Sequence, residues 1–571
     1  MSSGSDWEGT ARAWHARRSV RAGFVAVMVL ALCAQGFWAA VTNSATYDES
    51  GHLTTGLAAL RTGDFRMSVA YPPLMNLVCA AAAVGSAPPL PLRSREWREA
   101  RETDFSALYL WRGPTARAAP RLFVLARLPV ILISAGLAVL VFVWCRQLYG
   151  WPAAALALGF YCFEPNLLAH SSLATTDLGF TAAAALFAFA CWRYFRAPNA
   201  RRLVLCGIAL GVGLLAKFTG VLLLIVLPLL AVLSEQIDSR RGRDARHLSA
   251  LRLLGATAAM AAIAVVVLWA GYGFGLKSVS GSPWARLPAG QYLSGLLVQW
   301  SHQGAGQLAY LCGRGSTSGW WYYFPVAFLL KTPLPLLILL GIAVGLRRFR
   351  AEEAFLAVPV AVFFVAAMAQ RLDIGVRHIL PIYPFLILFA ARAAARPWPA
   401  ARPRWGGVVM GMLAAWMVVE ALLYAPQYIP YFNELAGGPA GGSRYLADSN
   451  LDWGQDLQRL AAWQRRHPEA PTIHLAYFGF ADPARYGVRA YPLPAGRPDW
   501  AASPIWPLRP MPESSHQTAG APRAGWIAVS VNNLVLDPRY AWLESYRPVA
   551  RAGYSIWIYH IRKKPASSGG L

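Results

Sequence analysis

The sequence predicts a polytopic α-helical membrane protein of about 11 transmembrane helices, followed by a small C-terminal α/β domain. Of its 571 residues, 56% are hydrophobic, and the mean hydropathy is +0.37. Charged residues make up only 14% of the chain, against about 25% in ordinary soluble domains. Apolar segments recur from the N-terminus to about residue 425, and the composition changes after that point. These three observations predict the fold class.

Each apolar segment is expected to cross the membrane as a helix, because about 20 apolar residues span a bilayer. The expected segments are 22–42, 122–144, 152–171, 177–195, 203–216, 219–233, 253–275, 323–346, 354–370, 378–395 and 406–425. The stretch 203–233 holds Lys217 in its middle, and a lone lysine at mid-bilayer would be costly. We therefore expect two short helices there, meeting at a turn around Lys217.

The net charge of +25 is explained by the positions of the arginines along the chain, which indicate membrane topology and not nucleic-acid binding. Arginines cluster between apolar segments, which is the positive-inside pattern of cytoplasmic loops. With the N-terminus inside, the sequence divides into a cytoplasmic segment 1–21, a transmembrane domain 22–425 with a long outer loop 43–121, and an outer domain 426–571. The tail is then on the same side as the 43–121 loop.

The outer domain is expected to mix one helix with several strands. Leucine, alanine and tryptophan recur at helical spacing between Asp452 and His467. Strand-like runs follow at Ile473–Phe480, Trp526–Val531 and Ser555–Ile561. We interpret this tail as a small α/β domain.

An acidic pair, Asp48 and Glu49, directly follows the first predicted span. Two carboxylates beside a low-dielectric phase cost energy unless they are used or satisfied, although acids also flank spans as solvated caps. The predicted topology gathers further ionisable and aromatic residues on the same outer face. They are His52, His170, Asp177, Lys217, Trp321, Tyr322, Lys331, Arg377 and His378.

Several of these residues also have purely structural interpretations. Asp177 is suited to capping the helix that follows it. Lys331 could extend its ammonium group to the membrane interface, and Trp321 and Tyr322 could belong to an interfacial aromatic belt. No zinc-type cysteine spacing is found among the seven cysteines. A metal site at Asp48, Glu49 and His52 would be poor in oxygen ligands, so no metal ligands are assigned.

Short motifs, taken in order, resemble the GT-C glycosyltransferases, in particular protein O-mannosyltransferases, lipid A aminoarabinose transferases and bacterial glycosyltransferase family 39. The resemblance covers roughly residues 20–425. The motifs are Tyr47–His52, Gly63–Phe65, Pro72–Leu74, Ala126–Pro129, His170 with Thr176–Asp177, Leu215–Thr219, Gly319–Pro325, Lys331–Pro333 and Gly375–Pro381. Residues 431–456 resemble the tail of uncharacterised bacterial members and depart from the eukaryotic enzymes.

The resemblance implies a membrane enzyme that transfers a sugar from a polyprenyl-phosphate donor to an acceptor on the outer face. It implies a bacterial inner-membrane location, with the active site and the C-terminal domain on the periplasmic side. It makes Asp48 the catalytic carboxylate, with Glu49 in support. The donor-phosphate candidates are Lys217, Arg377 and Lys331, then His378 and Arg127, and the substrate-binding candidates are His52, His170, Asp177, Trp321 and Tyr322.

The resemblance leaves some matters open, including the sugar, the polyprenyl length, a divalent metal ion, and whether the acceptor is protein, glycan or lipid. Two other functional classes are compatible with the composition. A multi-pass lipid or sugar transporter or flippase is one, although paired halves with interrupted helices are not found and the ionisable residues gather at one face. A catalytically silent scaffold, with 426–571 as a binding module, is the other.

Overall fold

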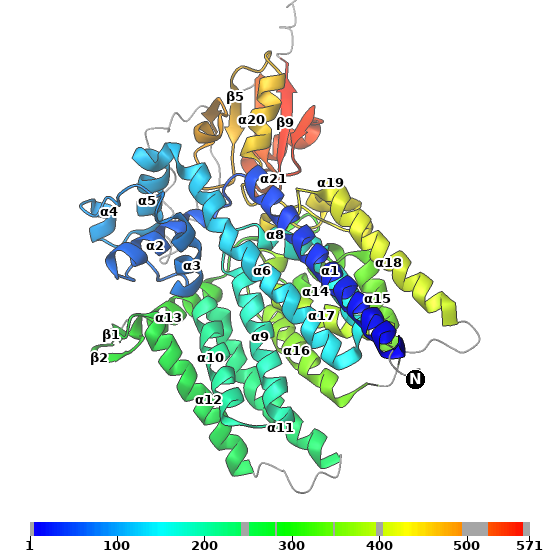
Figure 1. Ribbon diagram of the computed structural model, residues 1–571. Helices are drawn as coiled ribbons and strands as arrows, with labels where there is room; N and C mark the ends of the chain where they lie inside the picture. The colour runs from blue at the N-terminus through cyan, green and yellow to red at the C-terminus, as the bar shows by residue number, and fades with distance from the viewer. Residues whose placement is uncertain are drawn as a thin grey trace, which may run out of the picture.

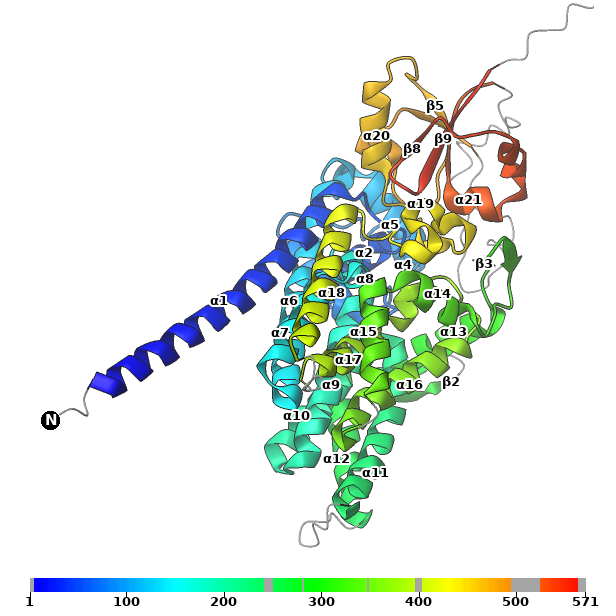
Figure 2. The same ribbon diagram turned by 90° about the vertical axis from the view of Figure 1, so that its right-hand side faces the viewer.

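Long apolar helices form the body of the protein, and a mixed β-sheet stands at one end of them (Figures 1 and 2). This arrangement is seen in a computed structural model, which describes residues 5–240, 250–279, 282–346, 349–395, 403–493 and 524–562. The predicted fold class, a polytopic helical membrane protein with a C-terminal mixed sheet, is confirmed.

All eleven predicted segments are helical. The helices are α1 (Ser5–Thr42), α6 (Ala119–Tyr149), α7 (Trp151–Cys162), α8 (Pro165–Ser171), α9 (Asp177–Arg196), α10 (Ala200–Ala216), α11 (Leu223–Arg240), α12 (Ala250–Gly271), α14 (Tyr323–Lys331), α15 (Leu334–Gly345), α16 (Ala354–Met368), α17 (Tyr383–Ala390) and α18 (Pro403–Tyr424). Within the described residues, eight helices are long and apolar enough to cross a membrane, and α14 with α15, bent by 109°, makes a ninth. The expected count of about 11 is higher because α7 and α10 have only 12 and 17 residues.

The predicted break around Lys217 is confirmed. Helix α10 ends at Ala216, Lys217 is extended with φ −160° and ψ 148°, and the 3-10 turn Phe218–Leu222 leads into α11. A Cβ atom on Gly220 would lie 2.3 Å from the carbonyl oxygen of Gly213. The turn therefore needs a glycine at this position to fold back against α10, and Lys217 sits at its apex.

The long loop 43–121 is itself helical. It contains α2 (Glu49–Thr62), α3 (Pro73–Ala83), α4 (Arg95–Arg98) and α5 (Glu102–Ala107). Helices α2 and α3 cross closely, since a Cβ on Gly56 would lie 2.0 Å from the backbone oxygen of Asn76. This crossing holds the N-terminal end of α2, and so Asp48, against the transmembrane helices.

The C-terminal sheet has five strands in the order β6-β5-β7-β9-β8. The strands are β5 (Ile473–Ala476), β6 (Ala490–Pro492), β7 (Gly525–Ser530), β8 (Ala550–Ala552) and β9 (Ile556–Ile561), and α20 (Leu457–Arg466) precedes them. Strand β5 runs parallel to β6 and β7, whereas β9 is antiparallel to β7 and β8. The three predicted strands and the helix are present, although α20 is shorter than predicted. Residues 494–523 and 563–571 of the predicted outer domain lie outside the described residues.

Two short hairpins that the sequence did not predict are also present. Strand β1 (Leu276–Val279) pairs with β2 (Ser282–Pro288), and β3 (Ala309–Leu311) pairs with β4 (Arg314–Ser316). Helix α13 (Gly290–Ala305) lies between the two hairpins. All three belong to the predicted loop 276–322.

The C-terminal segment, residues 448–456 between α18 and α20, is joined directly to the start of the 43–121 loop. The backbone amide of Ser44 donates to the carbonyl oxygen of Gln455 (2.9 Å), and that of Tyr47 donates to Trp453 (2.9 Å). The Ser44 hydroxyl donates to the carbonyl oxygen of Gly454 (2.8 Å). These bonds place the loop and the sheet at the same end of the helices (Figure 1).

Candidate active site

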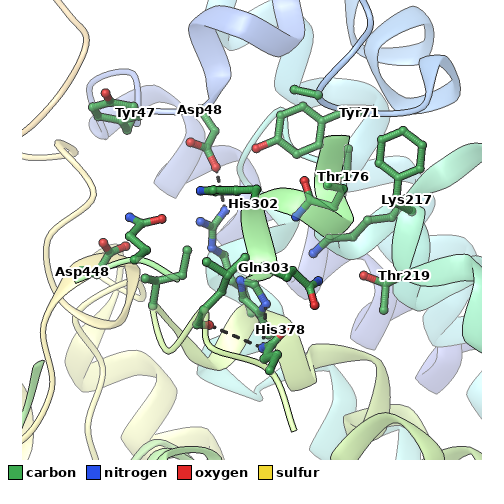
Figure 3. Close-up of a pocket in the computed structure, with 18 of the residues that line it drawn as sticks. Tyr47, Asp48, Tyr71, Thr176, Lys217, Thr219, His302, Gln303, His378 and Asp448 are labelled. Atoms are coloured by element: carbon green, nitrogen blue, oxygen red, sulfur yellow. Dashed lines mark hydrogen bonds and ion pairs between the residues drawn. The ribbon is translucent and has the colours of Figure 1, made fainter. Parts of the chain in front are cut away.

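A cavity of about 580 Å³ opens where the 43–121 loop, the transmembrane helices and the C-terminal segment meet (Figure 3). Its walls combine many apolar and aromatic side chains with a small set of ionisable ones. The ionisable and imidazole side chains on its walls are Asp48, Glu102, Lys217, His302, Arg377, His378 and Asp448. Four of them, namely Asp48, Lys217, Arg377 and His378, were predicted from the sequence.

Asp48 and Arg377 form an ion pair at the cavity wall. An Nη1 atom of Arg377 lies 2.6 Å from Oδ2 of Asp48. The Arg377 guanidinium also stacks over the ring of Trp453, with its Cζ 4.3 Å from the ring centroid. Asp48 is the residue before α2, and Arg377 lies in the 3-10 turn Val376–Ile382 that begins the next-to-last span. The stack fixes the plane of the guanidinium and leaves Asp48 facing the cavity.

Lys217 reaches the cavity from the break after α10. Its Nζ lies 2.6 Å from Oδ1 of Asp177, which is almost fully buried at the start of α9. Nδ1 of His170 lies 3.9 Å from the other oxygen of Asp177. Lys217 lines the cavity, whereas Asp177 and His170 lie behind it. The Asp177 side chain accepts no capping bond at α9, so its contact is the ion pair with Lys217.

The structure separates the adjacent acids Asp48 and Glu49. Glu49 is fully buried and accepts hydrogen bonds from Arg127 (2.6 Å) and from the amides of Thr46 and Ala174 (2.8 Å each). Successive residues of a helix point about 100° apart, so one acid faces the cavity and the other faces the protein interior.

Glu49 and Arg127 therefore do not reach the cavity. Arg127 also donates to the backbone carbonyls of Ala40 (2.6 Å), Asn43 (2.9 Å) and Ser44 (3.0 Å), which fixes the end of α1 against α6. Burial by itself would raise the pKa of Glu49, but Arg127 and the two amides carry that pKa below its ordinary value. The pair is a buried structural ion pair in this conformation.

Lys331 is buried inside the protein and does not line the cavity. Its Nζ donates to the carbonyl oxygens of Ile429 (2.9 Å) and Asn450 (2.6 Å) and lies 4.6 Å from the ring centroid of Phe432. Lys331 therefore anchors the segment after α18 to the helices. This position differs from both interpretations drawn from the sequence, phosphate binding and extension to the interface.

Of the remaining predicted residues, His378 lines the cavity, whereas His52, Trp321 and Tyr322 do not. Nδ1 of His378 is 3.1 Å from Nε2 of Gln370, and both residues line the cavity. His52 is buried, and its Nδ1 lies 2.8 Å from Oδ1 of Asn76. Trp321 and Tyr322 are 68% and 40% exposed and pack edge to face with each other, as in an interfacial belt.

Two acids at the cavity were not among the candidates from the sequence. Glu102 comes from α5, and burial, with the nearby Asp48 charge, raises its pKa to about 8. Asp448 comes from the C-terminal segment, and burial raises its pKa to about 6 although Arg377 opposes that shift. No spacing in the sequence distinguishes Glu102 from the other acids of its loop. Asp448 stands in a polar run, Asp448–Asn450, which is the one signal that could have drawn attention to it.

Across the described ranges, no group of three or more histidine, cysteine, aspartate or glutamate side chains is arranged to hold a metal ion. At the cavity, the Asp48 carboxylate is paired with the Arg377 guanidinium, and the Lys217 ammonium group is paired with Asp177 behind the wall.

Comparison with known proteins supports part of the sequence-based resemblance. Residues 122–269, from α6 to α12, match the family model described as dolichyl-phosphate-mannose-protein mannosyltransferase. No curated protein matches the chain. Two crystal structures of ArnT from Cupriavidus metallidurans, one bound to undecaprenyl phosphate and one in the apo state, are each 16% identical in sequence, with a TM-score of 0.48, covering 94% of this chain and 97% of theirs. Over residues 122–269, which include Arg127 and Lys217, the chain is thus similar to the dolichyl-phosphate-mannose-protein mannosyltransferase family.

Proposed function

We propose that this protein is a membrane glycosyltransferase that moves a sugar from a polyprenyl-phosphate-linked donor to an acceptor. The observation that carries this proposal is the meeting of Asp48, Lys217, Arg377 and His378 in one cavity, although they come from three distant parts of the sequence. A carboxylate can deprotonate an acceptor, and neighbouring cations can stabilise the charge of a departing phosphate. The description of the family matched over 122–269 supports the same chemistry.

In the proposed reaction, Asp48 takes the proton from an acceptor hydroxyl while the acceptor oxygen attacks the anomeric carbon of the donor sugar. The new glycosidic C–O bond forms as the C–O bond to the phosphate breaks, and the electron pair leaves with the polyprenyl phosphate. An acceptor amine would be oriented by the same carboxylate. General-base catalysis of this kind typically contributes about 10²–10⁴-fold to a rate.

Lys217 and Arg377 are assigned to the donor phosphate. An ammonium group has three donors, and one of them is used on Asp177 at Oδ1. The Arg377 guanidinium has five N–H donors, and Nη1 uses one of them on Asp48. Both cations thus retain donors for phosphate oxygens in a site with apolar walls, where such contacts are strengthened. His378 is a further phosphate contact on the same wall.

The apolar part of the cavity suits the polyprenyl chain of the donor. It is formed by the turn after Lys217 together with α13 and α16. Its side chains are Phe218, Val221, Leu222, Leu296, Trp300, Phe363, Ala366 and Ala367. Such a surface binds an isoprenoid by burial of apolar area.

We place the cavity on the extracytoplasmic side of a bacterial inner membrane. The C-terminal end of α9 carries Arg193 and Arg196, and the N-terminal end of α10 carries Arg201 and Arg202. These two helix ends meet at the end of the helices opposite the sheet (Figure 1). The positive-inside rule assigns that end to the cytoplasm. The cavity and the C-terminal sheet then face the periplasm.

The test is the Asp48→Asn variant, reconstituted in liposomes with a radiolabelled polyprenyl-phosphate sugar and an envelope extract from a host that lacks the protein. Loss of transfer by about 10³-fold is expected. Asp64→Asn, which removes a surface acid of the same loop paired with Arg66 at 2.6 Å, is the matched control and should keep full activity.

Two outcomes would overturn the proposal. Undiminished transfer by folded Asp48→Asn protein would remove Asp48 from the chemistry. Movement of intact labelled donor across the liposome membrane, with no sugar transferred by the wild type, would instead indicate a transporter.

A further inference from the structure

The cavity has two unlike sides, separated by the Asp48–Arg377 pair. In Figure 3, Lys217 and Thr219 lie to one side of Asp48, and Tyr47 and Asp448 lie to the other. The first side belongs to the transmembrane helices and holds the cation assigned to the donor. The second side is built from the start of the outer loop and from the C-terminal segment. No part of the donor is assigned to this second side, so it is available to the acceptor.

Aromatic rings form much of this second side. Tyr47 stacks on Phe478 with ring centroids 5.6 Å apart and an interplanar angle of 23°, and Phe480 meets Tyr47 at 6.1 Å and 65°. All three line the cavity. Phe478 and Phe480 follow strand β5, so the sheet positions them, and the bond from the Tyr47 amide to Trp453 holds Tyr47 beside them.

Asp448 supplies a carboxylate to the same side, and its backbone is held in an unfavourable conformation. Its φ is +55°, in the left-handed region that a non-glycine residue seldom adopts. The conformation is fixed by two bonds: the Asp448 amide donates to Oδ1 of Asn532 (2.7 Å), and Oδ1 of Asp448 accepts from the Ser449 amide (2.6 Å). Strain that the surrounding structure maintains in this way is typical of binding sites.

We infer that the acceptor is a saccharide, which binds with a ring face on the Tyr47, Phe478 and Phe480 wall and with its hydroxyl groups on Asp448. This inference rests on the proposed function and names its acceptor class. A sugar ring offers an apolar C–H face to aromatic rings and hydroxyl donors to carboxylates, so it satisfies both features of the wall. A lipid tail would cover the rings but would offer no hydrogen-bonding group to the Asp448 carboxyl. A hydroxyl group of a saccharide bound to this wall would lie next to Asp48, the proposed general base.

The first experiment identifies the chemical class of the product. Wild-type protein in liposomes receives radiolabelled polyprenyl-phosphate sugar and the envelope extract described above, and the product is digested with pronase and then extracted with chloroform–methanol. Label in a pronase-resistant saccharide is expected. Recovery in the aqueous phase identifies a free glycan, and recovery in the organic phase, in a species that chromatography separates from the unreacted donor, identifies the headgroup of a glycolipid. Label released as small glycopeptides would overturn the inference.

The second experiment tests the wall itself, with the pronase-treated saccharide fraction as the acceptor. Asp448→Asn and Phe478→Leu should each raise the KM for this fraction by about tenfold, the loss expected for one good polar or stacking contact. The KM for the donor should stay at the wild-type value, whereas a general loss of folded protein would lower the turnover without raising either KM. Asp482→Asn and Tyr491→Leu, a surface acid and an exposed aromatic of the same C-terminal region, are matched controls and should alter neither KM.

A failure of the saccharide subsite can be distinguished from a failure of the proposed glycosyltransferase function. If both wall variants keep the wild-type KM for the saccharide fraction, the saccharide subsite is overturned while the glycosyltransferase activity stands. If the wild type releases no sugar from the donor under any condition, the proposed function itself fails.

Discussion

Arg377 joins Asp48 across 329 residues of sequence, with Nη1 and Oδ2 2.6 Å apart, and its guanidinium lies on the ring of Trp453. The arginine thus connects three parts of the molecule: the outer loop, a transmembrane segment and the C-terminal region. A planar guanidinium can bond and stack at the same time, which a lysine ammonium group cannot reproduce.

The first prediction concerns this geometry. Arg377→Gln should lower kcat by about 10²-fold, since it removes both the charge facing the phosphate and the bond that orients Asp48. Arg377→Lys should recover only a small part of the loss because it restores charge without the stack. Steady-state transfer kinetics measure both, and Arg371→Gln, at an exposed arginine bonded to the Gly304 carbonyl (3.2 Å), is the control. Full recovery by lysine would show that charge alone is required.

The second prediction concerns the cation in the break after α10. Lys217→Met should raise the KM for the donor by about tenfold or more, because one charge-assisted contact to the phosphate is lost and Asp177 is left buried without its partner. Lys217→Arg should retain most of the donor affinity. Lys277→Met, at an exposed lysine on β1, is the control. Unchanged donor KM and turnover in folded Lys217→Met protein would remove Lys217 from phosphate binding.

The third prediction concerns the buried Glu49–Arg127 pair. Either Glu49→Gln or Arg127→Met leaves a buried polar or charged group poorly satisfied, so each should destabilise the fold by about 3–5 kcal/mol. Thermal unfolding of detergent-solubilised protein measures this loss. Arg66→Met, which breaks the exposed pair with Asp64, should hardly shift the midpoint. A small effect of both buried variants would contradict the assigned structural role.

The pH dependence of this pair has a definite sign. The pKa of Glu49 is lower in the folded protein than in the unfolded chain, so its stabilising contribution is present above the unfolded pKa of about 4.3. That contribution falls as the pH drops through the folded pKa. Unfolding midpoints measured downward from pH 5 should therefore decline more steeply for the wild type than for Glu49→Gln.

The fourth prediction concerns Glu102, whose pKa is shifted in the opposite direction. Burial, and then the Asp48 charge, raise its pKa to about 8, so the folded protein holds this proton where the unfolded chain has released it. Stability should then fall as the pH rises from about 4.3 to about 8, by at most about 1.4 kcal/mol per pH unit. Glu102→Gln should reduce this slope in thermal unfolding measured from pH 5 to 9.

A control from the same loop keeps the Glu102 prediction specific. Glu99 is exposed, and its hydrogen bond from Arg95 lowers its pKa, so Glu99 is already ionised throughout that window. Glu99→Gln should leave the slope unchanged. Equal slopes for the wild type and Glu102→Gln would show that Glu102 titrates as an ordinary surface acid.

The apolar pattern predicted the helices and the break among them. A single lysine within 31 apolar residues could be accommodated only at an interruption, and the structure has an extended Lys217 between α10 and the 3-10 turn. The alternation at Ser555–Ile561 similarly predicted the strand β9. In each case the relevant free-energy cost is that of placing polar groups in apolar surroundings or apolar groups in water. This cost depends on the segment itself, so it can be judged from the sequence.

The sequence by itself determined the class of fold, the positions of the spans and the presence of Asp48, Lys217, Arg377 and His378 as chemical groups. Only the tertiary structure decided which acid of the Asp48–Glu49 pair faces the cavity, that Lys331 is bonded to backbone carbonyls, and that Glu102 and Asp448 join the site. The physical reason is that the hydropathy of a segment determines whether that segment is stable in water or in lipid. The contacts of a side chain depend instead on its direction and on the residues that distant segments place beside it. A helical step of about 100° separates Asp48 from Glu49, and no local pattern encodes which side the cavity will occupy.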